Sequence, residues 1–124
     1  MIFLDTSVLV ESFTGSQPLL PSFRALIRQN ERMALSSVVF YEWQRGPRFA
    51  QELDVQEAAF PSEAIVPFTP EDAAIAGRLY RSVRRARGRE VDLMIAASAI
   101  RHDAELWTLN AADFKDIPGL RLLR

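Results

Sequence analysis

Apolar residues open the chain, and a single carboxylate interrupts them. The run Ile2–Leu4 stops at Asp5, and a second largely apolar run follows over Thr6–Phe13. A short apolar run rich in β-forming residues that closes on Asp-Thr-Ser is typical of a buried strand followed by a helix start. The pattern therefore predicts a strand that carries Asp5 to the rim of a sheet, where a helix begins.

Several later segments have the apolar spacing of helices. They cover residues 20–30, 38–44, 49–60, 70 to about 87, and 91–100. The clearest start signal is Thr69-Pro70-Glu71-Asp72, which supplies an N-cap, a proline at the first helical position and a carboxylate three residues after the cap. The segment 91–100 is apolar nearly all round, which indicates a central helix.

Further strands are predicted at residues 33–35, 64–68, 106–109 and 120–123, with a short helix or turn over 110–115. Strands that alternate with helices favour an α/β fold of three layers, a mostly parallel central sheet of four to five strands with helices on both faces. A chain of 124 residues is expected to form a single domain, residues 1–124. In such sheets ligands bind beyond the carboxyl ends of the strands.

Composition narrows the chemistry. The chain has no cysteine and one histidine, His102, which excludes disulfides, thiolate metal sites and multi-histidine zinc sites. Sixteen residues are acidic, and all but one of the 15 basic residues are arginine. The sequence shows no signal-peptide pattern and no apolar stretch of the roughly 20 residues that cross a bilayer, so a cytoplasmic protein without a membrane partner is expected.

Four carboxylates lie at positions that suit chemistry, although each also has a structural explanation. Asp5, Asp92 and Asp113 each stand near a predicted helix start, where a carboxylate can serve as a cap. Glu42 lies on the apolar face of its predicted helix, and a buried glutamate needs a cation. Either a salt bridge to Arg45 or Arg48, or a metal ion, would meet that need.

Taken together, the acids favour a metal site. Asp5 and Asp113 both follow predicted strands and so share one rim of a parallel sheet, while Asp92 heads the central helix. Clustered carboxylates without a balancing cation take up protons or bind divalent ions. Oxygen ligands suit magnesium or manganese, and magnesium can join protein acids to a substrate phosphate in phosphodiester hydrolysis.

Four segments in the same order resemble the PIN-domain ribonucleases, and within them the VapC-like toxins of type II toxin-antitoxin pairs. They are residues 3–9, 36–42, 92–99 and 108–114, and the resemblance extends over essentially the whole chain. It departs from the family at Ser7, where asparagine is common, and at Leu109, where a basic residue is common. Glu90 adds an acid just before Asp92.

The resemblance implies a PIN-like fold and a function. Asp5, Glu42, Asp92 and Asp113 would hold one or two Mg²⁺ ions, with Mn²⁺ as a substitute, that activate water to cleave RNA. Polar neighbours in the family fall on Thr6, Thr108 and Asn110. The resemblance also implies a homodimer and a small VapB-like antitoxin whose tail covers the acidic pocket.

Other residues permit a functional and a structural interpretation. Arg78, Arg81 and Arg85 share a face of the predicted helix and could hold an RNA backbone, or they could form a solvated surface. Trp43 and Trp107 are expected in the core or at an interface, and His102 is expected as a surface cap. Four apolar residues of the first two helices could contact the antitoxin or belong to the core: Phe13, Leu19, Leu20 and Phe23.

Two other classes of function fit the same residues less well. A phosphatase with Asp5 as nucleophile would need a second acid two residues later, where the chain has Ser7. A catalytically silent RNA-binding or protein-binding module would keep the fold without its metal, although all four acids are present.

Overall fold

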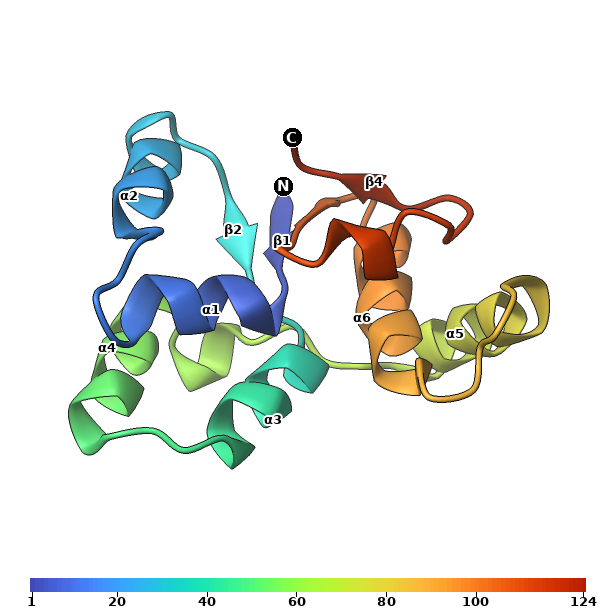
Figure 1. Cartoon of the computed structure of the whole chain (residues 1–124), viewed down its shortest axis with the longest axis horizontal. Helices are drawn as coiled ribbons and strands as arrows, with labels where there is room; N and C mark the ends of the chain where they lie inside the picture. Colours follow the sequence, from blue (N-terminus) through green and yellow to red (C-terminus); the bar gives the residue numbers. More distant parts are fainter.

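Four parallel strands form the centre of the molecule, in a computed structural model that describes all 124 residues (Figure 1). The sheet has the order β2-β1-β3-β4. The strands are short: β1 (Ile2–Leu4), β2 (Met33–Ala34), β3 (Glu105–Trp107) and β4 (Arg121–Leu122). Leu4 pairs with Trp107, so the carboxyl ends of the two central strands lie side by side. This rim is where the candidate site lies.

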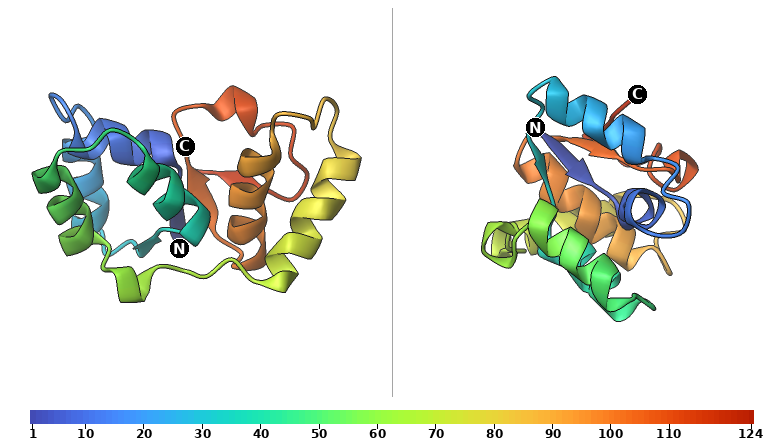
Figure 2. Two further views of the ribbon diagram at one scale, coloured as in Figure 1. Left: turned by 90° about the horizontal axis from the view of Figure 1, so that it is seen from below. Right: turned by 90° about the vertical axis from the view of Figure 1, so that its left-hand side faces the viewer.

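Helices cover the sheet on both faces (Figure 2). In chain order they are α1 (Thr6–Phe13), α2 (Leu20–Arg28), α3 (Ser37–Arg45), α4 (Ala50–Ala59), η1 (Ser62–Ala64), α5 (Pro70–Ser82), α6 (Glu90–Arg101) and η2 (Ala111–Asp113). α1 packs against α2, α3 and α4, whereas α6 packs against β3, α3 and α5. The expected three-layer α/β arrangement with a parallel sheet is confirmed. None of the helices is both long enough and apolar enough to cross a bilayer.

The core joins the central strands to both groups of helices. Phe13 contacts Phe23 edge to face, with ring centroids 5.4 Å apart, and contacts Trp43 at 6.3 Å. All three side chains are buried, so Phe13 and Phe23 belong to the core and are not exposed for an antitoxin. Leu19 and Leu20 are half-buried and pack against the same core.

The predicted strand at residues 64–68 is wrong. Only Val66 pairs, in an isolated bridge to Ser36. Its N–H donates to the Leu35 carbonyl at 2.9 Å, and its carbonyl accepts from the Ser37 N–H at 2.9 Å. The next residue is Pro67, which has no N–H to continue the ladder, so the sheet has four strands.

The helix predicted to reach residue 87 ends earlier, at Ser82. Its start is as expected, because Thr69 and Asp72 form the capping box with each other's backbone N–H. At the other end Val83 is extended and Arg85 has a positive φ of 55°. Arg85 therefore lies outside the helix that carries Arg78 and Arg81, so the predicted shared face is wrong for Arg85.

The lone histidine lies at the end of α6 and is partly buried, not on the open surface as predicted. His102 is the C-cap residue, and its ring lies 5.2 Å from the ring of Phe3. Its ring therefore packs against β1.

Candidate active site

Asp5 follows β1 and is buried, with 5% of its surface exposed. Its N–H donates to the Trp107 carbonyl at 2.9 Å, which continues the pairing of β1 with β3. Its Oδ2 accepts hydrogen bonds from Ser7 Oγ at 2.9 Å and from Thr108 Oγ1 at 2.7 Å. Asp5 is the N-cap residue of α1 but its side chain makes no capping hydrogen bond. The carboxylate is thus fixed by two hydroxyls and does not serve as a helix cap.

Glu42 lies on α3, with 20% of its side chain exposed. Thr6 Oγ1 donates to its Oε1 at 2.7 Å, which ties α3 to the start of α1. Arg45 Nη2 is 3.6 Å from Oε2, but the arginine side chain is 61% exposed, and such surface pairs contribute little. The other predicted partner, Arg48, stacks on Trp43 instead, 4.2 Å from its ring centroid. The guanidinium of Arg45 therefore screens Glu42 only weakly.

Asp92 lies in the first turn of α6, half-buried. Its pKa is raised to about 6, first by burial and then by the charges of Asp5, Asp113 and Glu42, in that order, while Arg89 opposes them. The other three carboxylates come from β1, η2 and α3, far apart in the sequence. Their common effect on Asp92 places each of them within electrostatic reach of Asp92.

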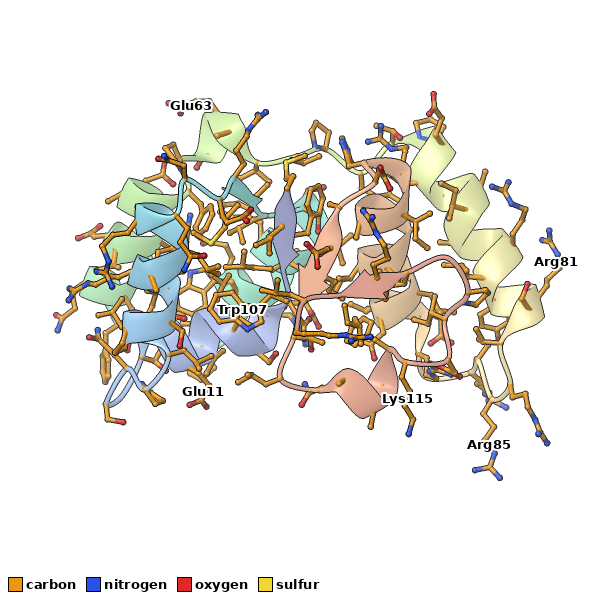
Figure 3. The ribbon with its side chains drawn as sticks, turned by 90° about the horizontal axis from the view of Figure 1, so that it is seen from above. Glu11, Glu63, Arg81, Arg85, Trp107 and Lys115 are labelled. Carbon is orange, nitrogen blue, oxygen red and sulfur yellow. The ribbon has the colours of Figure 1, made fainter.

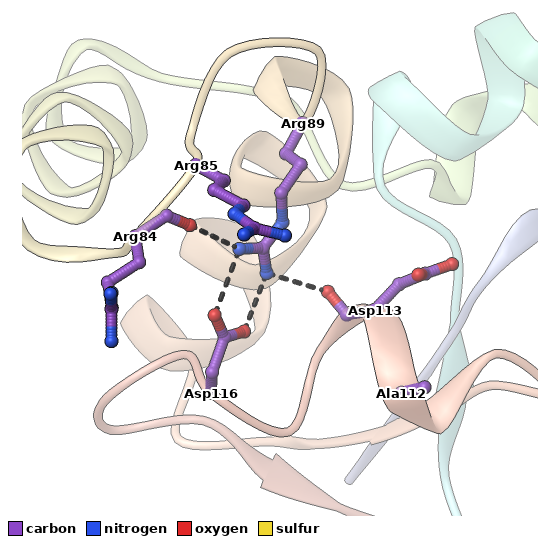
Figure 4. Close-up of a pocket in the computed structure, with 6 residues that line it drawn as sticks. All are labelled: Arg84, Arg85, Arg89, Ala112, Asp113 and Asp116. Carbon is purple, nitrogen blue, oxygen red and sulfur yellow. Dashed lines mark hydrogen bonds and ion pairs between the residues drawn. The ribbon is translucent and has the colours of Figure 1, made fainter.

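Asp113 ends η2 and is exposed. Asn110, the N-cap residue, makes no side-chain capping bond, so the capping-box explanation for this pair does not hold. Arg89 Nη2 donates to the Asp113 backbone carbonyl at 2.9 Å. The side chain of Asp113 points away from Arg89 (Figure 4), which leaves its carboxylate available.

The polar neighbours of the acids are hydroxyls for the most part. Thr6 and Thr108 each orient a carboxylate, whereas Asn110 contributes its backbone N–H, which donates to Thr108 Oγ1 at 3.0 Å. Ser7 was not among the predicted site residues, yet it donates to Asp5 and accepts the Leu109 N–H at 3.1 Å. Its place two residues after Asp5, in the first turn of α1, was the signal that pointed to it.

The donor set fits a hard divalent cation. It consists of carboxylate and hydroxyl oxygens, Asp5 Oδ1 accepts no hydrogen bond, and the pKa of Asp92 is raised by burial and by the neighbouring carboxylates. No three of the carboxylates converge closely enough to bind one ion directly. Mg²⁺ usually keeps several waters and takes only one or two carboxylates, so wide spacing between acids suits it.

A basic cleft of about 560 Å³ adjoins Asp113 (Figure 4). Its lining residues come from the loop after α5 and from the η2 region: Arg84, Arg85, Arg89, Ala112, Asp113 and Asp116. Of the three arginines predicted to share a helix face, only Arg85 lines this cleft. Figure 3 shows Arg81 and Arg85 projecting from α5 and from the loop that follows it.

Comparison with known proteins assigns the chain to a family. A model described as PIN domain matches residues 2–120. The chain belongs to the PIN domain family. This PIN domain is 36% identical, over 98% of both chains, to Ribonuclease VapC19 from Mycobacterium tuberculosis.

Solved structures agree with this assignment. VapBC2 from Rickettsia felis, bound to a DNA fragment of its promoter, matches this PIN domain with a TM-score of 0.77 and 26% identity, over 99% of this chain and 98% of the other. A toxin-antitoxin complex from Klebsiella pneumoniae matches with a TM-score of 0.71 and 26% identity, over 97% and 95%. DNA-bound VapBC from Salmonella typhimurium has a TM-score of 0.79, over 98% and 96%, but at 20% identity it supports the fold alone.

Proposed function

We propose that this protein is a magnesium-dependent endoribonuclease of the VapC type, the toxin of a toxin-antitoxin pair. The proposal depends above all on the raised pKa of Asp92, to which Asp5, Asp113 and Glu42 contribute after burial, since this effect requires acids from three other parts of the chain to lie near Asp92. A relative that is a ribonuclease, aligned over nearly the whole chain, supports the choice of RNA as substrate.

Each site residue has a role in this proposal. Asp5, Glu42, Asp92 and Asp113 would hold the cation, some of them through bound water, and Thr6 and Thr108 would keep the carboxylates of Glu42 and Asp5 in place. A bound Mg²⁺ or Mn²⁺ ion supplies Lewis-acid stabilisation of phosphoryl oxygens and acidifies a water molecule. The hydroxyl groups of Thr108 and Ser7 both donate to Oδ2 of Asp5, which keeps its Oδ1 free of hydrogen bonds.

The arginines suggest how RNA would lie. Arg85 lines the cleft next to Asp113, where a phosphate near the scissile bond would meet a guanidinium. Arg78 and Arg81 are exposed on α5 and do not line it. We expect Arg85→Ala to weaken RNA binding by an uncleaving Asp5→Asn protein, and to lower the salt slope by about 0.7 for each lost phosphate contact. Equal losses in Arg78→Ala and Arg81→Ala would contradict a specific role for the cleft.

The partners follow from the relatives. Solved structures similar to this chain include VapBC complexes, so a VapB-like antitoxin is proposed as its binding partner. A homodimer is proposed as its free form on the family resemblance alone. Light scattering on the purified protein, alone and with the product of an adjacent small gene, would test both. A monomer that binds no such product would remove these partners.

Cleavage of a structured RNA in the presence of Mn²⁺ tests the activity itself. Wild-type protein should cut the RNA, and EDTA or Asp5→Asn should abolish cutting. Glu63→Gln is the matched control, because it removes one exposed acid on η1, outside the four-acid set. Cleavage that persists in folded Asp5→Asn protein would refute the mechanism.

The same experiment separates the alternatives. RNA binding without cleavage under any metal would identify a silent module. A phosphatase that uses Asp5 would hydrolyse a phosphate monoester and form a phosphoenzyme, but a carboxylate that is 5% exposed and held by two hydroxyls is poorly placed for such attack.

A further inference from the structure

Arg89 is the most extensively bonded arginine near the acids. It lies in the loop just before α6, with 20% of its side chain exposed. Nη1 and Nη2 donate to the two carboxylate oxygens of Asp116 at 2.9 and 2.6 Å. Nη2 also donates to the Asp113 carbonyl at 2.9 Å, and Nη1 to the Arg84 carbonyl at 3.1 Å. One guanidinium thus binds three segments of chain together (Figure 4).

These contacts span the gap between two of the proposed metal ligands. Arg89 is three residues before Asp92, at the end of α6 that points to the site. Asp113 and Asp116 belong to the segment that follows β3. The fork geometry of a bidentate arginine–carboxylate pair fixes orientation as well as distance, which a single hydrogen bond would not do.

We propose that Arg89 and Asp116 form a clamp that positions the Asp113 backbone against the start of α6, so that Asp92 and Asp113 are preset as a pair of ligands. The clamp rests on the proposed metal-dependent function and adds two positioning residues to it. Neither residue touches substrate in this role. Partners that orient metal ligands commonly change metal affinity by about 10-fold to 100-fold when removed.

Charge alone predicts the opposite result, which makes the clamp testable. Arg89 interacts electrostatically with Asp92 and Asp113, so its positive charge opposes a cation there. Loss of that charge in Arg89→Gln, with Asp116 left as a free anion, would by electrostatics alone tighten cation binding. A positioning role predicts weaker binding, so the direction of the change separates the two effects.

The experiment measures Mn²⁺ affinity by calorimetry for wild type, Arg89→Gln and Arg89→Lys. Arg121→Gln is the matched control, because Arg121 also binds an aspartate and a backbone carbonyl, at Asp103, but from β4 at the opposite rim. We expect a dissociation constant about 10-fold higher in Arg89→Gln, an intermediate value in Arg89→Lys, and no change in the control.

Hydrogen exchange and a double mutant complete the test. Amides of residues 113–117 should exchange faster in Arg89→Gln than in Arg121→Gln, with equal urea midpoints. Arg89→Gln should add no further loss of affinity to Asp113→Asn, since the clamp acts through that residue. Unchanged or tighter Mn²⁺ binding in Arg89→Gln refutes the clamp, even if exchange is faster. Absence of saturable Mn²⁺ binding in wild type refutes instead the metal-dependent function, and with it the purpose of the clamp.

Discussion

Replacement of Asp92 by asparagine should stabilise the metal-free protein at neutral pH. Ionised Asp92 is partly buried and lies within reach of three other carboxylates, which together raise its pKa to about 6 from 3.8. The folded state therefore binds a proton more tightly than the unfolded chain does. Asparagine removes the charge and keeps the shape, so the variant avoids this penalty.

The size of this stabilisation and its pH range both follow from the raised pKa of Asp92. A difference of about two pKa units corresponds to about 3 kcal/mol in the free energy of unfolding. Solvent screening of this half-buried side chain reduces the expected effect to about 1 kcal/mol. Because the folded pKa is the higher one, the stability of the wild type falls as pH rises from about 4 to about 6. The advantage of Asp92→Asn should be full above this range and absent below it.

Urea unfolding in EDTA, at a pH of about 7.5 and of about 4, measures the effect. Asp103→Asn is the control, since that aspartate is an exposed partner of Arg121 away from the site. Added Mg²⁺ should reverse the order of stability at the higher pH, because wild type binds the ion better. A variant less stable than wild type at neutral pH, or equally stabilised at both pH values, would refute the reasoning.

Three further substitutions test residues that support the fold and the site. Arg101→Met should lower the free energy of unfolding by about 2 kcal/mol, because it leaves the fully buried carboxylate of Asp72 without its cation. Urea unfolding measures this change, and an unchanged free energy of unfolding would contradict the prediction. Trp43→Ala should cost about 3–5 kcal/mol by opening a cavity in the core, and a smaller shift in thermal unfolding would contradict it. Thr108→Val should raise the Mn²⁺ dissociation constant about 10-fold with little change in melting temperature, and unchanged affinity would show that its hydrogen bond to Asp5 is dispensable.

Only part of the acidic site could be predicted from topology. Parallel strands end on one edge, so Asp5, directly after β1, and the segment after β3 that carries Asp113 were expected at the same rim. Glu42, on α3, could be grouped with them only through the family resemblance. Whether Asp5 served as a cap could not be decided in this way. Its two hydroxyl partners include Thr108, which is 103 residues away, and no local pattern specifies that contact.

Two errors of secondary structure have local causes. Residues 64–68 are apolar enough for a strand, but Pro67 limits the pairing of Val66 to a single bridge. α5 ends at Ser82 without a glycine or proline to mark the end. The first strong stop signal in the sequence is Gly88, so the helix was predicted to extend too far. That error concealed the loop from which Arg85 and Arg89 reach the cleft.

The pairing of Arg89 with Asp116 leaves the charges of the four acids unneutralised by this arginine. This guanidinium is close enough to Asp92 and Asp113 to affect them, and an ion pair with either would neutralise part of the acid cluster. Instead both of its arms bind Asp116, and it touches Asp113 only through the backbone carbonyl. Arg45 likewise stays 3.6 Å from Glu42, on the surface. Because the nearby cations are bound elsewhere or weakly held, the four carboxylates keep a net negative charge, and this charge both destabilises the metal-free fold and provides the attraction for a divalent ion.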